Sequence, residues 1–124
     1  MKTSIKYFTI AILILILLFS ISNWQKKEVN LIKYLKITTG LVTSINPSSK
    51  TGTFCDYEFK INGFNYKGSS KIFLSATKSE KLIGKIFLIV YDSTDFRNNN
   101  ILILKKHYEK FKLNYPDSLN WIEN

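Results

Sequence analysis

The chain has little of what catalytic, metal-binding and disulfide-stabilised proteins use. Its 124 residues include one cysteine, one histidine and one arginine, with only two prolines and five glycines. A single cysteine, Cys55, excludes an intrachain disulfide, and lipoprotein processing is excluded because no cysteine directly follows the apolar N-terminal run. No Gly-rich phosphate loop and no serine in a nucleophile elbow are present in the sequence.

The side chains that could carry chemistry have simpler explanations. His107 lies in the basic run KKHYEK and is predicted to be a neutral surface histidine. Cys55 falls on the apolar side of an alternating pattern, which predicts a buried, inert thiol. One His and one Cys do not form a four-ligand zinc site without carboxylates. We therefore expect no enzyme activity, no cofactor and no metal.

Two groups of acidic and amide side chains are candidate cation ligands. Asp56 and Glu58 are two residues apart, as expected for the solvated face of a strand. Asp92, Asp95 and the asparagines at 98–100 miss the spacing of the twelve-residue calcium loop and lack its closing Glu. The segment 93–100, STDFRNNN, is predicted to be a loop rich in turn-forming residues.

A long apolar run lies near the N-terminus. From Tyr7 to Ile21 the chain has fifteen uncharged residues, mostly Ile and Leu. At about 1.5 Å per residue, this core covers roughly 22 Å, less than the hydrocarbon thickness of about 30 Å. The uncharged segment continues to Gln25, however, and so reaches nineteen residues with lysines at both ends. Because lysines can extend to the headgroups, this length is enough to span a bilayer.

The same run has three explanations: an uncleaved anchor, a signal peptide, and, least favoured, a buried helix of a soluble protein. Ser20 and Ser22 satisfy the small-residue pattern for cleavage before Asn23, although weakly. Against cleavage stand the bulky Phe19 and Ile21, and Trp24 sits where an interfacial aromatic residue belongs. We favour the anchor, and its predicted lipid-facing residues are Tyr7, Ile10, Leu13, Ile14, Leu17, Leu18, Ile21 and Trp24. The lysines on the two sides do not settle which side of the membrane holds the rest of the chain.

The remaining hundred residues predict one small β-domain. The predicted organisation is an anchor at 1–24, a juxtamembrane neck at 25–36 that is either helical or interfacial, and a β-domain at 37–124. Cys55, Tyr57, Phe59 and Ile61 alternate with polar residues, and Asn62-Gly63 follows, the preferred pair for a tight hairpin turn.

Further strands are expected over 37–45, 72–74, 86–92 and 101–104, with a turn at 46–53 and one or two helical turns or a polar loop over 76–83. The segment 105–115 fits either a helix or a strand, and Leu119, Trp121 and Ile122 are expected to pack back as a C-terminal clasp. The predicted fold is mainly β, with five or six antiparallel strands in a small barrel or rolled sheet, because closure protects strand edges.

The order of these motifs resembles that of small bacterial membrane-anchored proteins of unknown function with a short β-barrel domain. The matching residues are Gly40 and Val42, then Tyr57, Phe59, Asn62 and Gly63, then Gly84, Lys85, Ile89, Tyr91 and Asp92. The resemblance covers residues 37–104, and the loop after Asp92 departs from it by lacking a proline. It implies a β-barrel beside a membrane helix and implies no activity.

Together these patterns predict a non-enzymatic, single-pass protein of the cell membrane that presents a β-barrel interaction module near the lipid bilayer. Its partner is expected to be an unidentified membrane or envelope protein. The net charge of +9 comes from lysines spread along the chain and favours anionic surroundings. One alternative is a secreted or periplasmic binding domain released by signal cleavage.

The other alternative is a basic barrel that binds nucleic acid. Phe64, Tyr66, Tyr91 and Phe96 would be its stacking platforms, and Lys60, Lys67, Lys71 and Lys85 would contact phosphates. It is less favoured because most of these aromatic residues have the inward parity and only one arginine is present.

Overall fold

The computed structural model describes residues 2–48 and 52–124, which form two compact units, Met1–Asn30 and Leu31–Asn124. The first unit is the greater part of helix α1 (Lys2–Lys33). This helix continues without a break through residues 25–33, where the sequence allows either a helix or an interfacial segment. The predicted neck is therefore helical as far as Lys33, and the β-structure begins two residues earlier than expected, at Leu35.

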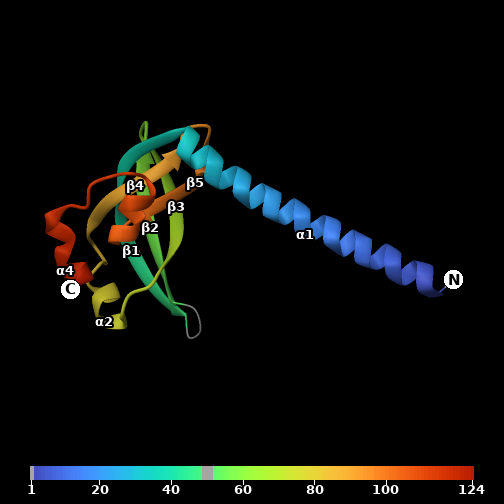
Figure 1. The fold of residues 1–124 in the computed structure, drawn as a ribbon. Coiled ribbons are helices and arrows are strands. Elements are labelled where there is room, and N and C mark those ends of the chain that lie inside the picture. The colour runs from blue at the N-terminus through green and yellow to red at the C-terminus, as the bar shows by residue number, and fades with distance from the viewer. Residues whose placement is uncertain (1, 49–51) are drawn as a thin grey trace. The chain divides into compact units, whose positions relative to one another are not determined.

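The second unit is a five-stranded antiparallel sheet rolled into a nearly closed barrel (Figure 1). Its strands are β1 (Leu35–Ser48), β2 (Gly52–Ile61), β3 (Phe64–Ile72), β4 (Ile86–Asp92) and β5 (Asp95–Leu102). Short helices follow β3 and β5: α2 (Ala76–Glu80), α3 (Lys105–Lys110), a 3₁₀ turn at Asp117–Leu119, and α4 (Asn120–Glu123). The predicted fold class, an N-terminal apolar helix, a small antiparallel barrel and a short C-terminal helix, is confirmed.

The strand order β3-β2-β1-β4-β5 places β1 at the centre of the sheet. Strands β1 to β3 form a meander, and the chain then returns past α2 to pair β4 with the free side of β1. This is a Greek-key connection, and the arrangement resembles the partly open five-stranded barrel of OB folds.

The β2–β3 hairpin agrees with its prediction. Asn62 has a φ of 52° and Gly63 a φ of 83°. These are the positive values that a two-residue type I′ turn needs. Cys55, Tyr57, Phe59 and Ile61 are buried, as the alternation predicted. The predicted turn at 46–53 is narrower than expected, because β1 extends to Ser48 and β2 begins at Gly52, and residues 49–51 lie outside the described residues.

The segment 93–100 corrects a prediction, because most of it is a strand and not a loop. Only Ser93 and Thr94 make the turn, and β5 begins at Asp95. Asn99 and Asn100 pair with Tyr91 and Val90 of β4. Pairing with a neighbouring strand overrides the low intrinsic strand preference of Asn and Asp.

Two apolar clusters hold the barrel together. The inner cluster contains inward residues of all five strands together with Leu82, Leu104 and Ile122. The outer cluster lies on the other face of β4 and β5, where Val90 and Leu102 pack with Leu31, Tyr108 and the half-buried Phe111. The C-terminal segment thus covers part of the sheet and contributes Ile122 to the inner core, as expected of the clasp.

Side chains close the barrel between β3 and β5. The Tyr57 hydroxyl donates to Asn99 Oδ1 at 2.5 Å, and the Ser70 hydroxyl donates to Asn100 Oδ1 at 3.3 Å. Gly68 of β3 faces this seam, and a Cβ there would collide with Asn99 and the Tyr57 ring. The asparagines of β5 therefore link this strand to β2 through Tyr57 and to β3 through Ser70, and neither strand is a neighbour of β5 in the hydrogen-bonded sheet.

Candidate functional site

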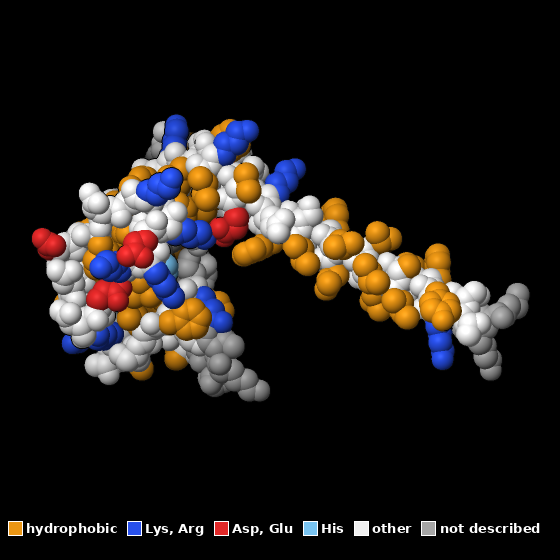
Figure 2. Space-filling model, in the orientation of Figure 1, with side chains coloured by type: hydrophobic (Ala, Val, Ile, Leu, Met, Phe, Trp, Pro, Cys, Tyr) orange, Lys and Arg blue, Asp and Glu red, His pale blue; other side chains and the backbone are white. Residues whose placement is uncertain are grey.

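The eight predicted lipid-facing residues all lie exposed along α1. Their exposed fractions run from 47% at Ile21 to 72% at Tyr7. Other apolar side chains of the same helix are exposed as well, among them Phe8, Ile12, Leu15, Ile16 and Phe19. Figure 2 shows apolar side chains along the visible face of this helix with few charges among them. A helix that is apolar on all sides belongs in an apolar environment.

Two hydroxyl groups within this apolar stretch are satisfied by the helix itself. Thr9 Oγ1 donates to the carbonyl of Ile5 at 2.9 Å, and Ser20 Oγ donates to the carbonyl of Ile16 at 3.0 Å. Because lipid offers no hydrogen-bond partners, such internal bonds lower the cost of burying a hydroxyl in a bilayer. The helix is long and apolar enough to cross a membrane, and an N-terminal signal sequence would meet the same criterion.

The hairpin turn leaves an aromatic side chain exposed. Phe64 directly follows Gly63 and is 70% exposed, although its parity is that of the inward residues of the strand. Its neighbours Asn65 and Lys60 are also exposed. The hairpin turn that the sequence predicts therefore positions an exposed apolar group, one of the four rings proposed for base stacking.

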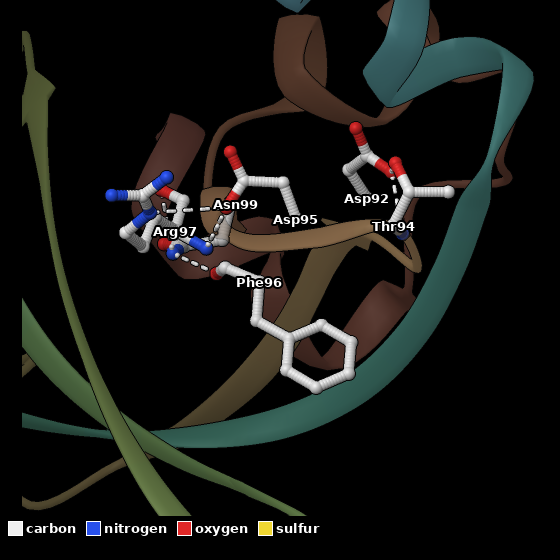
Figure 3. Close-up of polar contacts among 6 residues, drawn as sticks. All are labelled: Asp92, Thr94, Asp95, Phe96, Arg97 and Asn99. Carbon is white, nitrogen blue, oxygen red and sulfur yellow. Dashed lines mark hydrogen bonds and ion pairs between the residues drawn. The ribbon is translucent and has the colours of Figure 1, made fainter.

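The β4–β5 turn is fixed by its own side chains, as Figure 3 shows. Asp92 is almost fully buried, and its Oδ1 accepts hydrogen bonds from the backbone N–H and the hydroxyl of Thr94, at 2.8 and 2.6 Å. Asp95 pairs with Arg97 at 3.2 Å. The backbone N–H of Ser93 donates to the carbonyl of Tyr34, which ties this turn to the beginning of β1.

The thiol and the imidazole both have structural positions. Cys55 is fully buried, and burial together with the nearby Asp56 charge raises the pKa of its thiol to about 12. His107 is half-buried and not on the surface as expected, and its Nδ1 accepts hydrogen bonds from the backbone N–H groups of Ile103 and Leu104. Burial, with the neighbouring charges of Lys106 and Lys110, lowers the pKa of His107 to about 4.

Neither side chain is arranged as a nucleophile or a base. A thiol with a raised pKa carries little thiolate at neutral pH, and the imidazole lone pair of His107 is already engaged. Among residues 2–48 and 52–124, no group of three or more His, Cys, Asp or Glu side chains lies close enough together to hold a metal ion.

Three of the four aromatic residues proposed for base stacking pack against one another. The ring of Phe96 makes edge contacts with Tyr66 and Tyr91, at centroid distances of 5.2 and 5.5 Å, and Tyr66 stacks on Phe59. These rings fill one end of the barrel. Phe64 is the member of that set that stays largely exposed.

An open groove of about 320 Å³ runs along the outer face of β1. One wall is apolar, with Leu41 and Ile86, and the other carries Lys60, Asn65 and Glu58. Glu58 makes an ion pair with Lys67 at 3.8 Å. The groove is too open to exclude water, so it offers a surface rather than an enclosed site.

An apolar N-terminal helix followed by a small β-barrel fits the class of single-pass membrane or signal-anchored proteins. Comparison with protein-family models, curated proteins and solved structures gives no match for this chain.

Proposed function

We propose that this chain is a non-enzymatic, single-pass membrane protein whose helix α1 stays in the bilayer and presents the barrel as an interaction module beside it. The observation that carries the proposal is the helix, which exposes apolar side chains on all sides over residues 7–21 and bonds the hydroxyls of this run to its own backbone. A signal peptide is in the membrane only until it is cleaved. A permanent span stays there, so an apolar surface and internally bonded hydroxyls stabilise it for the lifetime of the protein.

Continuity between the helix and the barrel supports an uncleaved anchor. Helix α1 ends at Lys33 and β1 begins at Leu35, so a single residue, Tyr34, separates them. Leu31, in the last turn of the helix, is buried in the outer cluster of the barrel unit. The end of the helix is therefore part of the folded domain, and one continuous helix joins it to the apolar run. Cleavage before Asn23 would interrupt this helix but leave Leu31 in place.

The non-enzymatic part of the proposal draws on the positions of Cys55 and His107. Both are built into the fold, the first as a buried thiol and the second as a hydrogen-bond acceptor. Catalysis requires an activated nucleophile or a paired acid and base that substrate can reach. The partner that best suits an exposed basic barrel is a membrane or envelope component.

Membrane fractionation with mass measurement tests the proposal. The full-length chain should remain with membranes through alkaline extraction and keep its complete N-terminal segment. The variant Ile14→Lys places a charge at the centre of the apolar run 7–21, at a cost of about 3 kcal/mol, and should reduce the membrane-bound fraction. Asn23→Lys makes the same change near the predicted interface, where lysine can extend to the headgroups, and should leave that fraction unchanged.

Cleavage would give a different result. A soluble mature chain that begins at Asn23 would contradict the anchor and support a released binding domain. Equal membrane retention of the Ile14→Lys and Asn23→Lys variants would also count against a spanning helix.

A further inference from the structure

Three separate segments of the chain meet at one end of the barrel. The register pairs Leu35, the first residue of β1, with Asp92, the last residue of β4. The end of β2 lies towards the same end, because Gly40 pairs with Phe59 and the strands are antiparallel. The hairpin turn at Asn62-Gly63 and the β4–β5 turn therefore both lie at the end where β1 begins (Figure 1).

This end of the barrel carries exposed aromatic, aliphatic and basic side chains together. We define the anchor-proximal face by its six exposed residues, Lys33, Tyr34, Lys36, Ile37, Lys60 and Phe64. Phe64 is 70% exposed and Ile37 is 45% exposed. The Lys33 ammonium group lies over the Tyr34 ring, 5.2 Å from its centroid. Aromatic rings mixed with lysines are the composition that proteins place at a membrane interface.

The acidic side chains of the β4–β5 turn are already engaged by the fold. Asp92 is buried and bonded to Thr94, and Asp95 is paired with Arg97. The hairpin turn on the other side of the face is Asn62-Gly63, which carries no charge. The face itself contains three lysines and no acidic residue, so it carries a positive charge that is complementary to the anionic headgroups of a bilayer.

We propose that the anchor-proximal face rests on the lipid surface of the bilayer, with the Phe64 ring among the headgroups and Lys33, Lys36 and Lys60 beside anionic phosphates. This rests on the proposed function, because it needs α1 to remain in the membrane. Nine helical residues, 25–33, follow Trp24. Their rise is about 14 Å, and the headgroup layer is about 5 to 8 Å deep. A tilted helix and the extended lysine side chains close the remaining distance.

A fluorophore at the hairpin tip tests this contact. The full-length chain carrying Phe64→Cys is labelled with an environment-sensitive fluorophore and reconstituted in phosphatidylcholine vesicles, with or without phosphatidylserine. A headgroup nitroxide lipid serves as the quencher. Labelling of the unsubstituted chain checks that the buried Cys55 does not react.

Phe73→Cys is the matched control. Phe73 is also exposed, at 62%, and directly follows the other end of β3. At about 3.3 Å per residue, the length of this strand separates the two positions by roughly 30 Å. The two labels therefore report on opposite ends of the same strand.

The expected result is quenching several-fold stronger at position 64 than at position 73, and stronger still with phosphatidylserine. Replacing Lys33, Lys36 and Lys60 with Gln should remove the phosphatidylserine effect. The same change at Lys71, Lys81 and Lys106, outside the face, should leave it in place.

Equal quenching at positions 64 and 73 would overturn the inference. So would contact that appears only in native membranes and not in lipid vesicles, because it would identify a protein as the partner. Alkaline extraction of the same vesicles separates this failure from failure of the proposed function. A chain that resists extraction without a position-64 signal keeps its anchor and loses only the lipid contact.

Discussion

The side chain of His107 acts as a hydrogen-bond acceptor inside the fold, which makes stability depend on pH. Its pKa is lowered from 6.5 to about 4 by burial and by Lys106 and Lys110, while Glu123 opposes the shift. The unfolded chain therefore binds a proton before the folded chain does. The contribution of His107 is complete above about pH 6.5 and is lost as pH falls towards 4.

We expect protonation of His107 to lower the free energy of unfolding by about 1 to 2 kcal/mol, allowing for the partial exposure of the ring. Urea unfolding of the detergent-solubilised chain, followed by near-ultraviolet circular dichroism at several pH values, measures it. His107→Gln keeps a side-chain acceptor for the same backbone N–H groups but does not titrate, so its stability should fall less over this range. An identical pH dependence in the two proteins would refute the role of His107.

Gly68 is required at the seam because no side chain fits there. A Cβ at this position would meet Asn99 and the Tyr57 ring. Gly68→Ala should therefore cost about 2 to 3 kcal/mol of unfolding free energy through overpacking.

Gly63→Ala is the control for this substitution. Gly63 has a φ of 83°, but nothing lies within 4 Å of a methyl group added there. Gly63→Ala should lower the free energy of unfolding by about 1 kcal/mol, from backbone strain alone. Urea unfolding ranks the two variants, and an equal or reversed order would contradict the packing of the seam.

The sequence predicts which side chains are buried better than it predicts their partners. Tyr57 is expected in the core from its parity alone, and it is 1% exposed. Its hydroxyl partner Asn99 is 42 positions away, in a segment expected to be a loop. A pattern with a period of two reports on one strand, whereas such a partner depends on how strands far apart in the chain are brought together.

At the scale of secondary-structure elements, the C-terminal clasp supplies a buried side chain to the barrel core. Ile122 of α4 is 1% exposed and belongs to the inner cluster, and Lys78 of α2 donates to its carbonyl at 3.0 Å. Ile122→Ala should cost about 2 to 4 kcal/mol through the cavity that it leaves. Asn120, in the same short helix, is exposed. Asn120→Ala should cost less than about 0.5 kcal/mol. Similar small decreases in the free energy of unfolding for Ile122→Ala and Asn120→Ala, measured with urea, would show that the clasp is not part of the core.

A strand can be predicted from sequence when its alternating pattern and the strand that it pairs with lie in the same short stretch of the chain. The β2–β3 hairpin has both its alternation and its turn in one short stretch of sequence, and its position agrees with the prediction. Strand β5 is different, because its first six residues are polar or aromatic and take their strand conformation from pairing with β4. The residues of the proposed anchor were predictable from composition. The anchor-proximal face was not, because it depends on the register of three strands and no single strand has a sequence pattern that indicates it.

At the scale of the whole molecule, the two parts differ in how much their sequence determines. The apolar helix follows from composition and length alone, since a long uncharged run has few stable alternatives. The barrel needs tertiary information, because strand order and closure depend on side chains such as Asn99 and Ser70 that carry no strong preference of their own.

The central position of β1 has a mechanical consequence. The chain that leaves the apolar helix enters the barrel through this strand, which pairs with β2 on one side and β4 on the other. A force applied along β1 would therefore load two ladders of hydrogen bonds at once, instead of peeling an edge strand one bond at a time. If the helix stays in a bilayer as proposed, a barrel attached through its central strand should resist unfolding under tension better than one attached through an edge strand.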